Sequence, residues 1–493
     1  MRASVLAAIV VSALVLSSGC LSGEESNAKG GKRAGAVVTK APLPADQAVA
    51  QLLDLDFDPI QIIDKEHAGG EPVILVDKKG VIVVSSHPGY THIRGPDTDL
   101  ATGTTGQAFV WRSEDKGKTY TFVGIPGLGL GPRNAATSVS DPDIAMSPDG
   151  TIFLTTLQSL VSIPVEISKD SGKTWSGQPL HGPPGVDRNW IEACNDKDVY
   201  QVYSSFGHAP LTLIPGGPFG SGGRWFAHST DGGMTWTDQH ATNAGGNFAC
   251  DQTTEGGKYL YLGGGTALSV STDKGKTFKR ITVAGHQGSG GLSEPDVDGA
   301  GNVYTTWIEN STTGPRVFYA YSRDHGVSFE RAVEIPVDGL PKGTQIWPWI
   351  TAKDEGHIGI VWYGASKLGA PRDFGTDVEW HVYSAIVPNA LDPVPTASVA
   401  KASNTFIHKG AICIGTVCQA DPSPKGDRRL GDFFTATFDH DGALLIATGS
   451  TAPVQGTGPI DGAGLSHPAV IKQIAGPSGL MGKVLGPAVS EAP

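Results

Sequence analysis

Hydrophobic and polar positions alternate in short runs along most of the chain. In seven places such a run is followed by a tight turn rich in Asp, Gly, Asn and Lys and then by a second alternating run, which is the pattern of a β-hairpin. These seven units span residues 72–86, 142–156, 190–204, 248–263, 295–309, 349–363 and 433–447. The pattern predicts an all-β protein with few helices.

A polar segment of eight residues recurs between the hairpins, with the form Ser-x-Asp-x-Gly-x-(Thr or Ser)-aromatic. Its five copies span residues 113–120, 168–175, 229–236, 271–278 and 322–329, and their starts lie 55, 61, 42 and 51 residues apart. We expect each copy to form the turn of a second hairpin that follows one of the first five. Two hairpins make a four-stranded sheet, and sheets repeated at about this period are typical of a β-propeller.

We therefore predict a β-propeller of four-stranded blades with seven blades, or six if the first or last hairpin is a cap. The sixth unit has an outer hairpin around 378–386 without the repeated segment. The seventh is followed by a strand at 468–474, and residues 60–63 are expected to close the ring.

The residue types of the segment fit a turn that satisfies its own hydrogen bonds. The Gly can take a positive φ, while the Ser and Asp side chains accept hydrogen bonds from backbone N–H groups. The aromatic residue that ends the segment, such as Tyr120 or Trp175, can bury its ring between blades. This predicts scaffolding rather than an active site, with calcium binding as the alternative.

These segments resemble the Asp-box, or bacterial neuraminidase repeat, of sialidase-like propellers. Residues 187–193 (DRNWIEA), 347–364 and 431–442 also resemble exported bacterial proteins of the sialidase-like type. The resemblance covers about residues 70–450. It implies that the ligand site lies on the face opposite the Asp-boxes.

The N-terminus has the features of an export signal. Arg2 is followed by the apolar run 3–16, which is too short to span a bilayer, and then by small residues that resemble a lipoprotein cleavage box ending at Cys20. We expect a signal peptide at 1–20, lipidation of Cys20, a flexible tether at 21–44 and a single propeller domain at 45–493. Plain secretion and an uncleaved anchor are the alternatives.

Four further cysteines, Cys194, Cys250, Cys413 and Cys418, favour disulfides in an exported protein. Cys194 and Cys250 end similar segments of successive repeats, so we expect them to pair, which leaves Cys413 with Cys418. A four-thiolate metal site is the alternative, although no Cys-x-x-Cys pair is present.

The composition excludes several partners. The formal net charge is -12, only 17% of residues are charged, and no basic cluster occurs in the repeats, which argues against nucleic acid. No dinucleotide or phosphate-binding glycine motif is present, so we expect no cofactor. His87 and His92 with Asp97 or Asp99 are a possible metal set, but we expect plain surface histidines and a monomer.

If the repeated segments lie on one face, the starts of the inner strands and the ends of the second strands lie on the other. The strand starts are Asp141, Asp143, Asp187, Arg188, Trp190, Glu294, Asp296, Trp347, Trp349 and Asp432. The strand ends are His87, Tyr90, His92, Arg94, Tyr203, His208, Trp307, Glu309, Trp362, Tyr363, Arg372 and Asp373. We predict ligand binding by Asp187, Arg188, Trp190, Trp307, Glu309, Trp347, Trp349 and Trp362. The carboxylates of the Asp-Pro-Asp and Glu-Pro-Asp motifs (141–143 and 294–296) are expected to tie neighbouring blades together.

The resemblance also implies a possible catalytic set. Sialidases clamp the substrate carboxylate with three arginines and use a Tyr–Glu nucleophile pair and an Asp acid/base. The matching residues here would be Arg94, Arg316 and Arg372, then Tyr363 with Glu294 or Glu309, and Asp97 or Asp99. The segment around Arg94 (HIRGP) departs from the family's aromatic-Arg-Ile-Pro motif.

The sequence thus predicts an exported propeller that binds a glycan or protein ligand outside the cytoplasm. An exo-α-sialidase or related glycoside hydrolase is the alternative function. A structural envelope protein without a small ligand is the third.

Overall fold

The computed structural model places most of the chain from residue 54 to residue 486. It describes residues 54–67, 69–87, 108–124, 141–157, 163–178, 186–205, 223–236, 238–254, 257–286, 292–311, 314–337, 340, 342–414, 427–452 and 466–486. The predicted signal peptide, tether and Cys20 lie outside these residues.

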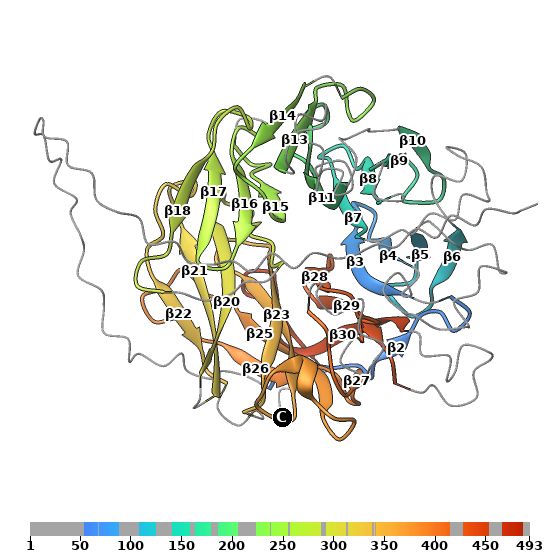
Figure 1. The fold of residues 1–493 in the computed structure, drawn as a ribbon, viewed down its shortest axis with the longest axis vertical. Helices are drawn as coiled ribbons and strands as arrows, with labels where there is room; N and C mark the ends of the chain where they lie inside the picture. Colours follow the sequence, from blue (N-terminus) through green and yellow to red (C-terminus); the bar gives the residue numbers. More distant parts are fainter. Residues whose placement is uncertain are drawn as a thin grey trace, which may run out of the picture. The chain divides into compact units, whose positions relative to one another are not determined.

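Seven antiparallel sheets surround a common centre (Figure 1). The first four blades are β3 (Gly70–Val76), β4 (Ile82–His87), β5 (Phe109–Ser113) and β6 (Thr121–Gly124); β7 (Asp143–Met146), β8 (Ile152–Thr155), β9 (Val165–Ser168) and β10 (Ser176–Gln178); β11 (Val186–Ala193), β12 (Val199–Ser205), β13 (Gly223–Ser229) and β14 (Asp238–Thr242); β15 (Phe248–Cys250), β16 (Leu260–Gly264), β17 (Ala267–Ser271) and β18 (Lys279–Thr282).

The other three blades complete the ring. They are β19 (Asp296–Val297), β20 (Val303–Ser311), β21 (Gly314–Ser322) and β22 (Ala332–Ile335); β23 (Gln345–Ala352), β24 (Ile358–Ala365), β25 (Glu379–Val387) and β26 (Ser398–Lys401), with β27 (His408–Lys409) paired to β25; β28 (Thr435–Phe438), β29 (Leu444–Ser450) and β30 (His467–Pro477), with β1 (Asp56–Phe57), β2 (Gln61–Ile62) and β31 (Val484–Leu485) paired to β30.

The ring closes through its innermost strands. Each of β3, β7, β11, β15, β19, β23 and β28 contacts the next, and β28 contacts β3. The seven predicted hairpins are the first two strands of the seven blades, so the prediction of a seven-bladed propeller is confirmed.

The N-terminal strands complete the last blade. β1 and β2 both pair antiparallel with β30, with Gln61 opposite Val470. Closure by residues 60–63 is therefore confirmed. β27 and β31 were not predicted, because strands of two residues carry no readable alternation.

The alternation of side chains explains why neighbouring blades adhere. Successive residues of a strand point to opposite faces of the sheet. In blade 1, Val83 packs in a cluster with Ile152 of blade 2, whereas the next residue, Val84, packs in a cluster with Leu445 of blade 7. Blade 1 therefore buries both faces of its sheet, one against blade 2 and the other against blade 7.

The five repeated segments form the turns between the third and fourth strands of blades 1 to 5. In the first, Ser113 Oγ accepts the N–H of Gly117 at 2.9 Å, and Asp115 accepts both the N–H and the hydroxyl of Thr119 at 2.9 and 2.6 Å. The same bonds occur in the other four turns. The glycine φ angles are 88°, 74°, 78°, 79° and 76°. The turn geometry expected from the sequence is confirmed.

Side chains from these turns also reach the preceding blade. Lys116 Nζ lies 2.6 Å from Asp441, and Lys274 Nζ lies 2.7 Å from Asp198. Because Asp441 and Asp198 lie in turns between first and second strands, the two kinds of turn share one end of the ring.

One predicted disulfide is present. Cys194, directly after β11, is bonded to Cys250 of β15 with a Cα–Cα distance of 5.6 Å, and so links the inner strands of blades 3 and 4. Cys413 takes part in a disulfide. Cys418 lies outside the described residues, so the pairing of these two stays a prediction.

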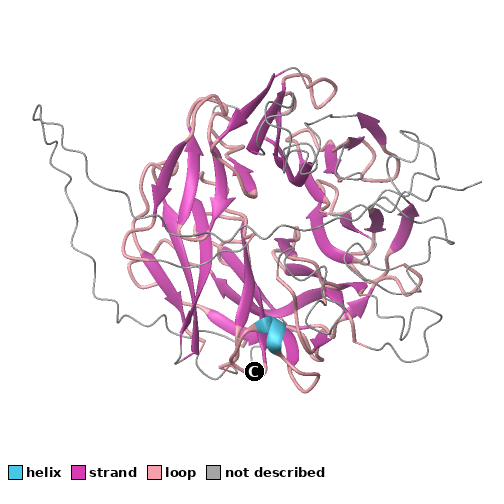
Figure 2. Ribbon diagram, viewed as in Figure 1, coloured by secondary structure: helices cyan, strands magenta, loops and turns pink. Residues whose placement is uncertain are grey.

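Within the described residues the only helical element is a short 3-10 turn, η2, at Pro371–Asp373 (Figure 2). No helix there has the length and apolar character needed to cross a membrane.

Candidate functional site

We call the end of the ring at which the innermost strands begin the funnel face. In an antiparallel meander, this end also carries the connections between second and third strands. The repeated turns between third and fourth strands lie at the opposite end, which we call the turn face. The predicted ligand side and the repeated turns are therefore at opposite ends of the ring.

Four innermost strands are entered through a residue with left-handed backbone that is not glycine. These residues are Glu71, Asp141, Arg188 and Trp347, with φ of 47°, 51°, 56° and 54°. In three of these blades the pairing with the second strand shifts register there, which is the mark of a β-bulge. A left-handed backbone costs a side-chain-bearing residue about 1–2 kcal/mol, and bulges re-aim side chains near functional sites.

Six funnel-face side chains from blades 1, 2, 3 and 7 form one group, which we call the funnel cluster: Glu71, Asp141, Asp187, Arg188, Arg428 and Asp432. Arg188 lies between two of the carboxylates. Its Nη1 is 3.5 Å from Asp141 Oδ2, and its Nη2 donates to Asp432. Arg428 donates to both oxygens of Asp432, with Nη2–Oδ2 at 2.7 Å. One arginine from blade 3 thus joins blades 2 and 7.

Glu71 is the most deeply buried carboxyl group of the cluster, with no exposed surface. Its Oε1 accepts the backbone N–H of Asp432 at 2.8 Å, and its Oε2 lies 3.5 Å from Nε2 of His87. A Cβ atom on Gly431 would lie 2.0 Å from Glu71 Cγ, so this position must be glycine for the carboxyl group to fit.

The carboxyl groups have opposed pKa shifts. Burial, followed by the charge of Asp141, raises the pKa of Glu71 well above its usual range and that of Asp187 to about 7. Burial also acts on Asp141, but Arg188 and a hydrogen bond from Glu71 outweigh it and lower the pKa. The pKa of Asp432 is also lowered, because the hydrogen bonds from Arg428 and the charge of Arg188 outweigh the effect of burial.

The charge of Asp141 therefore acts on both Glu71 and Asp187 and raises the pKa of each. The cluster combines carboxyl groups whose pKa values are raised with others whose pKa values are lowered, an arrangement typical of acid/base sites.

A second set of carboxylates lies on the inner strands. Asp143 accepts the N–H of Ile191 at 2.7 Å, and Asp296 accepts that of Ala352 at 2.7 Å. These contacts join blade 2 to blade 3 and blade 5 to blade 6, so the prediction that both motifs tie blades together is confirmed.

Burial also perturbs this second set. It raises the pKa of Asp143 to about 7 and that of Asp296 to about 6. Burial, and then the charge of Asp143, raise the pKa of Glu192 and Glu294 well above the usual range.

The predicted sialidase residues have other partners here. Tyr363 is fully buried and its hydroxyl lies 2.6 Å from Thr448 Oγ1, while Arg316 makes a bidentate pair with Glu334. Arg372 is exposed on η2. Arg94 and Asp97 lie outside the described residues, as does Asp99. The described members thus do not share a site through these contacts, and their catalytic roles stay predictions.

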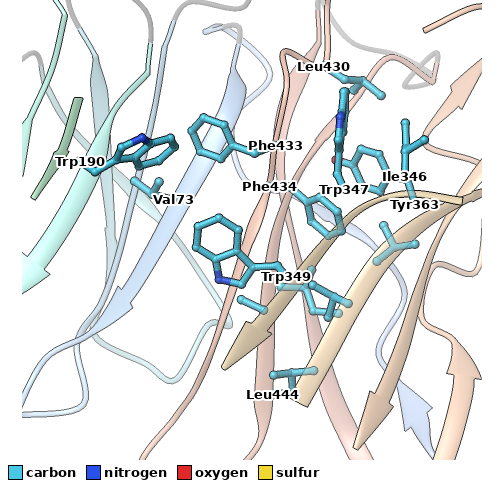
Figure 3. Close-up of a cluster of buried hydrophobic side chains, with 14 of the residues drawn as sticks. Val73, Trp190, Ile346, Trp347, Trp349, Tyr363, Leu430, Phe433, Phe434 and Leu444 are labelled. Atoms are coloured by element: carbon cyan, nitrogen blue, oxygen red, sulfur yellow. The ribbon is translucent and has the colours of Figure 1, made fainter. Parts of the chain in front are cut away.

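The predicted ligand-binding aromatic residues are all buried. Trp190 and Trp349 both pack on Phe433, with ring centroids 5.1 and 6.3 Å apart (Figure 3). Trp347 packs on Tyr363. Trp307 and Trp362 have no exposed surface and lie in clusters between blades. These rings belong to the cores within and between blades, and their predicted contact with a ligand stays untested.

Sequence reasoning placed Asp141, Asp187, Arg188 and Asp432 on the correct face but missed several partners. The missed residues are Glu71, His87 as the neighbour of Glu71, Arg428 and Glu192. Glu71 had a readable signal, because Glu71-Pro72 matches the dipeptides at 141–142, 294–295 and 347–348 that open other blades. Arg428 had none, since it lies in a connection that is not repeated.

Among the described residues no group of three or more His, Cys, Asp and Glu side chains is arranged to hold a metal ion. His92 lies outside these residues, so the metal set with His87 stays untested. The expectation of a surface residue is wrong for His87, which ends β4 and has no exposed surface.

No family model and no curated protein matches this chain. Among solved structures, it is similar to a protein of unknown function from Dyadobacter fermentans DSM 18053, at 14% identity and TM-score 0.42 over 87% of this chain and 99% of that one. It is also similar to an α-L-arabinanase of Penicillium chrysogenum, at 12% identity and TM-score 0.39 over 85% of this chain and 97% of that one. A third similar structure is the NanB sialidase of Streptococcus pneumoniae, at 11% identity and TM-score 0.39 over 84% of this chain and 70% of that one. These similarities are too distant to transfer an activity or a ligand, and the propeller assignment rests on the sheet order of this chain.

Proposed function

We propose that the protein is an exported propeller of the Asp-box type, held at the membrane by a lipid on Cys20, that binds a glycan at its funnel face. The observation that supports this most is the funnel cluster. Four carboxyl groups and two guanidinium groups from four blades meet at the strand starts, and the pKa values of the carboxyl groups are shifted in opposite directions. Perturbed ionisable groups gathered in this way mark functional sites.

The charges favour a neutral sugar over an anionic one. Arg188 and Arg428 are already paired with Asp432 and Asp141. They are therefore engaged with internal carboxylates and are poorly suited to clamp the carboxylate of a sialic acid. Arg188 has 22% of its side chain exposed, and the adjacent Asp187 is 9% exposed. A guanidinium and a carboxyl group together can donate to and accept from sugar hydroxyls.

Glycoside hydrolysis is the second candidate, and one observation favours it. Burial raises the pKa of Asp187 to about 7, while Arg188 lowers that of the neighbouring Asp141, so the cluster contains a candidate acid and a candidate base. Glycosidases divide these roles between two carboxyl groups.

A glycan array with three proteins tests the binding proposal. We expect the unaltered protein to retain neutral oligosaccharides and Asp187→Asn to bind them about tenfold more weakly, the effect of losing one hydrogen bond. Asp115→Asn, on the turn face, is the matched control and should bind as the unaltered protein does. The proposal would be refuted if the unaltered protein bound no glycan on the array, or if both variants lost the same amount of affinity.

Release of a fluorophore from neutral glycosides and sialosides then separates binding from hydrolysis. Turnover of neutral glycosides that is lost in Asp187→Asn favours the hydrolase. Incorporation of labelled palmitate that disappears in Cys20→Ser tests the lipid anchor, and a label retained in that variant would contradict it.

A further inference from the structure

The connections that enter blades 1 and 5 are fastened in the same way. In the connection from β2 to β3, His67 Nδ1 donates to Asp64 Oδ2 at 2.9 Å, and the same oxygen accepts the indole N–H of Trp111 at 2.7 Å. Trp111 belongs to β5, so this carboxylate joins the connection to blade 1. We call these three residues latch 1.

In the connection from β18 to β19, His286 takes the place of His67. Its Nδ1 donates to Glu309 Oε1 at 2.9 Å, and the same oxygen accepts the indole N–H of Trp307 at 3.0 Å. Glu309 and Trp307 belong to β20 of blade 5. We call these three residues latch 2.

Aromatic contacts hold both imidazole rings. His67 stacks on Phe122 at 4.0 Å and meets Phe109 edge-on at 5.2 Å. His286 contacts Trp307 and Phe318 at 5.4 and 5.1 Å. Each histidine is about one-quarter exposed.

The carboxylates are held ionised, which fixes the imidazole tautomer. Burial raises the pKa of Asp64, but the hydrogen bonds from His67 and Trp111 outweigh it and lower the pKa to about 2. Burial likewise raises that of Glu309, and the bonds from His286 and Trp307 lower it. An ionised carboxylate can only accept, so each histidine carries its proton on Nδ1.

The two latches differ in the origin of the carboxylate. Asp64 comes from the connection itself, whereas Glu309 comes from the blade. The same hydrogen bonds are formed although the carboxylate comes from a different segment in each case. This indicates that the common role is to attach the connection to the blade. A catalytic histidine would not be expected twice, at two separate blade interfaces.

Both connections lead into funnel-face carboxyl groups. Latch 1 stands directly before Gly69, whose N–H is bonded to Ser466 O at 2.8 Å, and before the strand start that carries Glu71. Latch 2 stands in the connection that precedes Glu294.

We propose that latches 1 and 2 are positioning devices that hold the entries of blades 1 and 5 and thereby fix the strand starts that carry the buried Glu71 and Glu294, on which the shape of the ligand site depends. This inference rests on the proposed function for the role of the ligand, but the fastening itself can be measured without one. Through Glu71, latch 1 also orients Asp141 and the backbone of Asp432.

Hydrogen exchange of the ligand-free protein tests the fastening. Trp111→Phe keeps the ring and removes the indole donor, and we expect amides of residues 69–73 to exchange about tenfold faster. Trp307→Phe should do the same at 292–297. Trp380→Phe is the matched control, because its buried indole donates to Gly410 O at 2.8 Å in blade 6. It should leave both segments unchanged.

Asp64→Asn provides a second variant if Trp111→Phe does not fold. Unchanged exchange at 69–73 in the folded variant would overturn the inference, whether or not any glycan binds. Faster exchange with weaker binding of the neutral oligosaccharides retained by the unaltered protein supports it. Faster exchange with unaltered affinity would overturn the positioning role, while failure of the unaltered protein to bind any glycan would refute the proposed function instead.

Discussion

The two ends of this propeller use the same backbone device for different purposes. On the turn face, Lys116, Ser171, Lys274 and His325 are left-handed residues in four of the repeated turns. On the funnel face, Glu71, Asp141, Arg188 and Trp347 are left-handed at four strand starts. Both sets include residues that contact a neighbouring blade, so strain alone does not identify the working end.

The electrostatic environment separates the two ends. On the turn face an exposed lysine meets one carboxylate, and hydrogen bonds from Thr119 lower the pKa of Asp115 to about 2. On the funnel face four carboxyl groups share two guanidinium groups, and two of the carboxyl pKa values are raised. The carboxylates of the turn face are satisfied by hydrogen bonds within their own turns, whereas the funnel face holds carboxyl groups whose pKa values are raised, as is common at functional sites.

Removal of the charge of Arg188 should show the largest difference in stability between the two ends. Arg188→Met leaves Asp141 and Asp432 without their shared cation, and we expect about 3–5 kcal/mol lower stability in urea unfolding. Lys274→Met removes a partly exposed cation from Asp198 on the turn face and should cost less than about 1 kcal/mol. Equal losses of stability in the two variants would show that Arg188 contributes no more than a surface ion pair does.

A hydroxyl deletion should show that the turns are scaffold. Ser168→Ala leaves the buried N–H of Gly172 without its acceptor, which costs about 1–3 kcal/mol. We expect lower stability in urea with unaltered affinity for any glycan that the protein retains. A change in affinity without a change in stability would assign the turn a direct role in binding.

A pH dependence of stability should be confined to the funnel face. The native state holds the proton of Asp187 up to about pH 7, whereas the unfolded chain releases it near pH 4. Stability of the unaltered protein therefore falls with rising pH relative to Asp187→Asn, by about 1.4 kcal/mol for each pH unit between these two values. Asp115→Asn should show a flat difference over the same range, because the pKa of Asp115 lies below it.

Much of the fold could be predicted because its signals are local. Alternation revealed the hairpins, and the Ser-x-Asp turns were readable because every hydrogen bond within them spans at most four residues. The closure by β2 could be anticipated, since residues 60–63 and 468–474 were the apolar runs left without a partner.

The site could be predicted only in part. The strand starts Asp187, Arg188 and Asp432 were found from their place in the repeat. The opposed pKa shifts of this group were not predicted, because they depend on burial and on Glu71, which lies 361 residues from Asp432 in sequence. The latches were also missed, since Asp64 and Glu309 reach equivalent places from different segments.

The most direct test of this contrast is a carbon-13 titration of the Asp and Glu carboxyl groups, with Asp187→Asn and Asp115→Asn to assign two resonances. We expect Asp187 to titrate near pH 7 and Asp115 near pH 2. If both titrated near pH 4, the two ends would be electrostatically alike and the funnel cluster would lose its claim to be the working site.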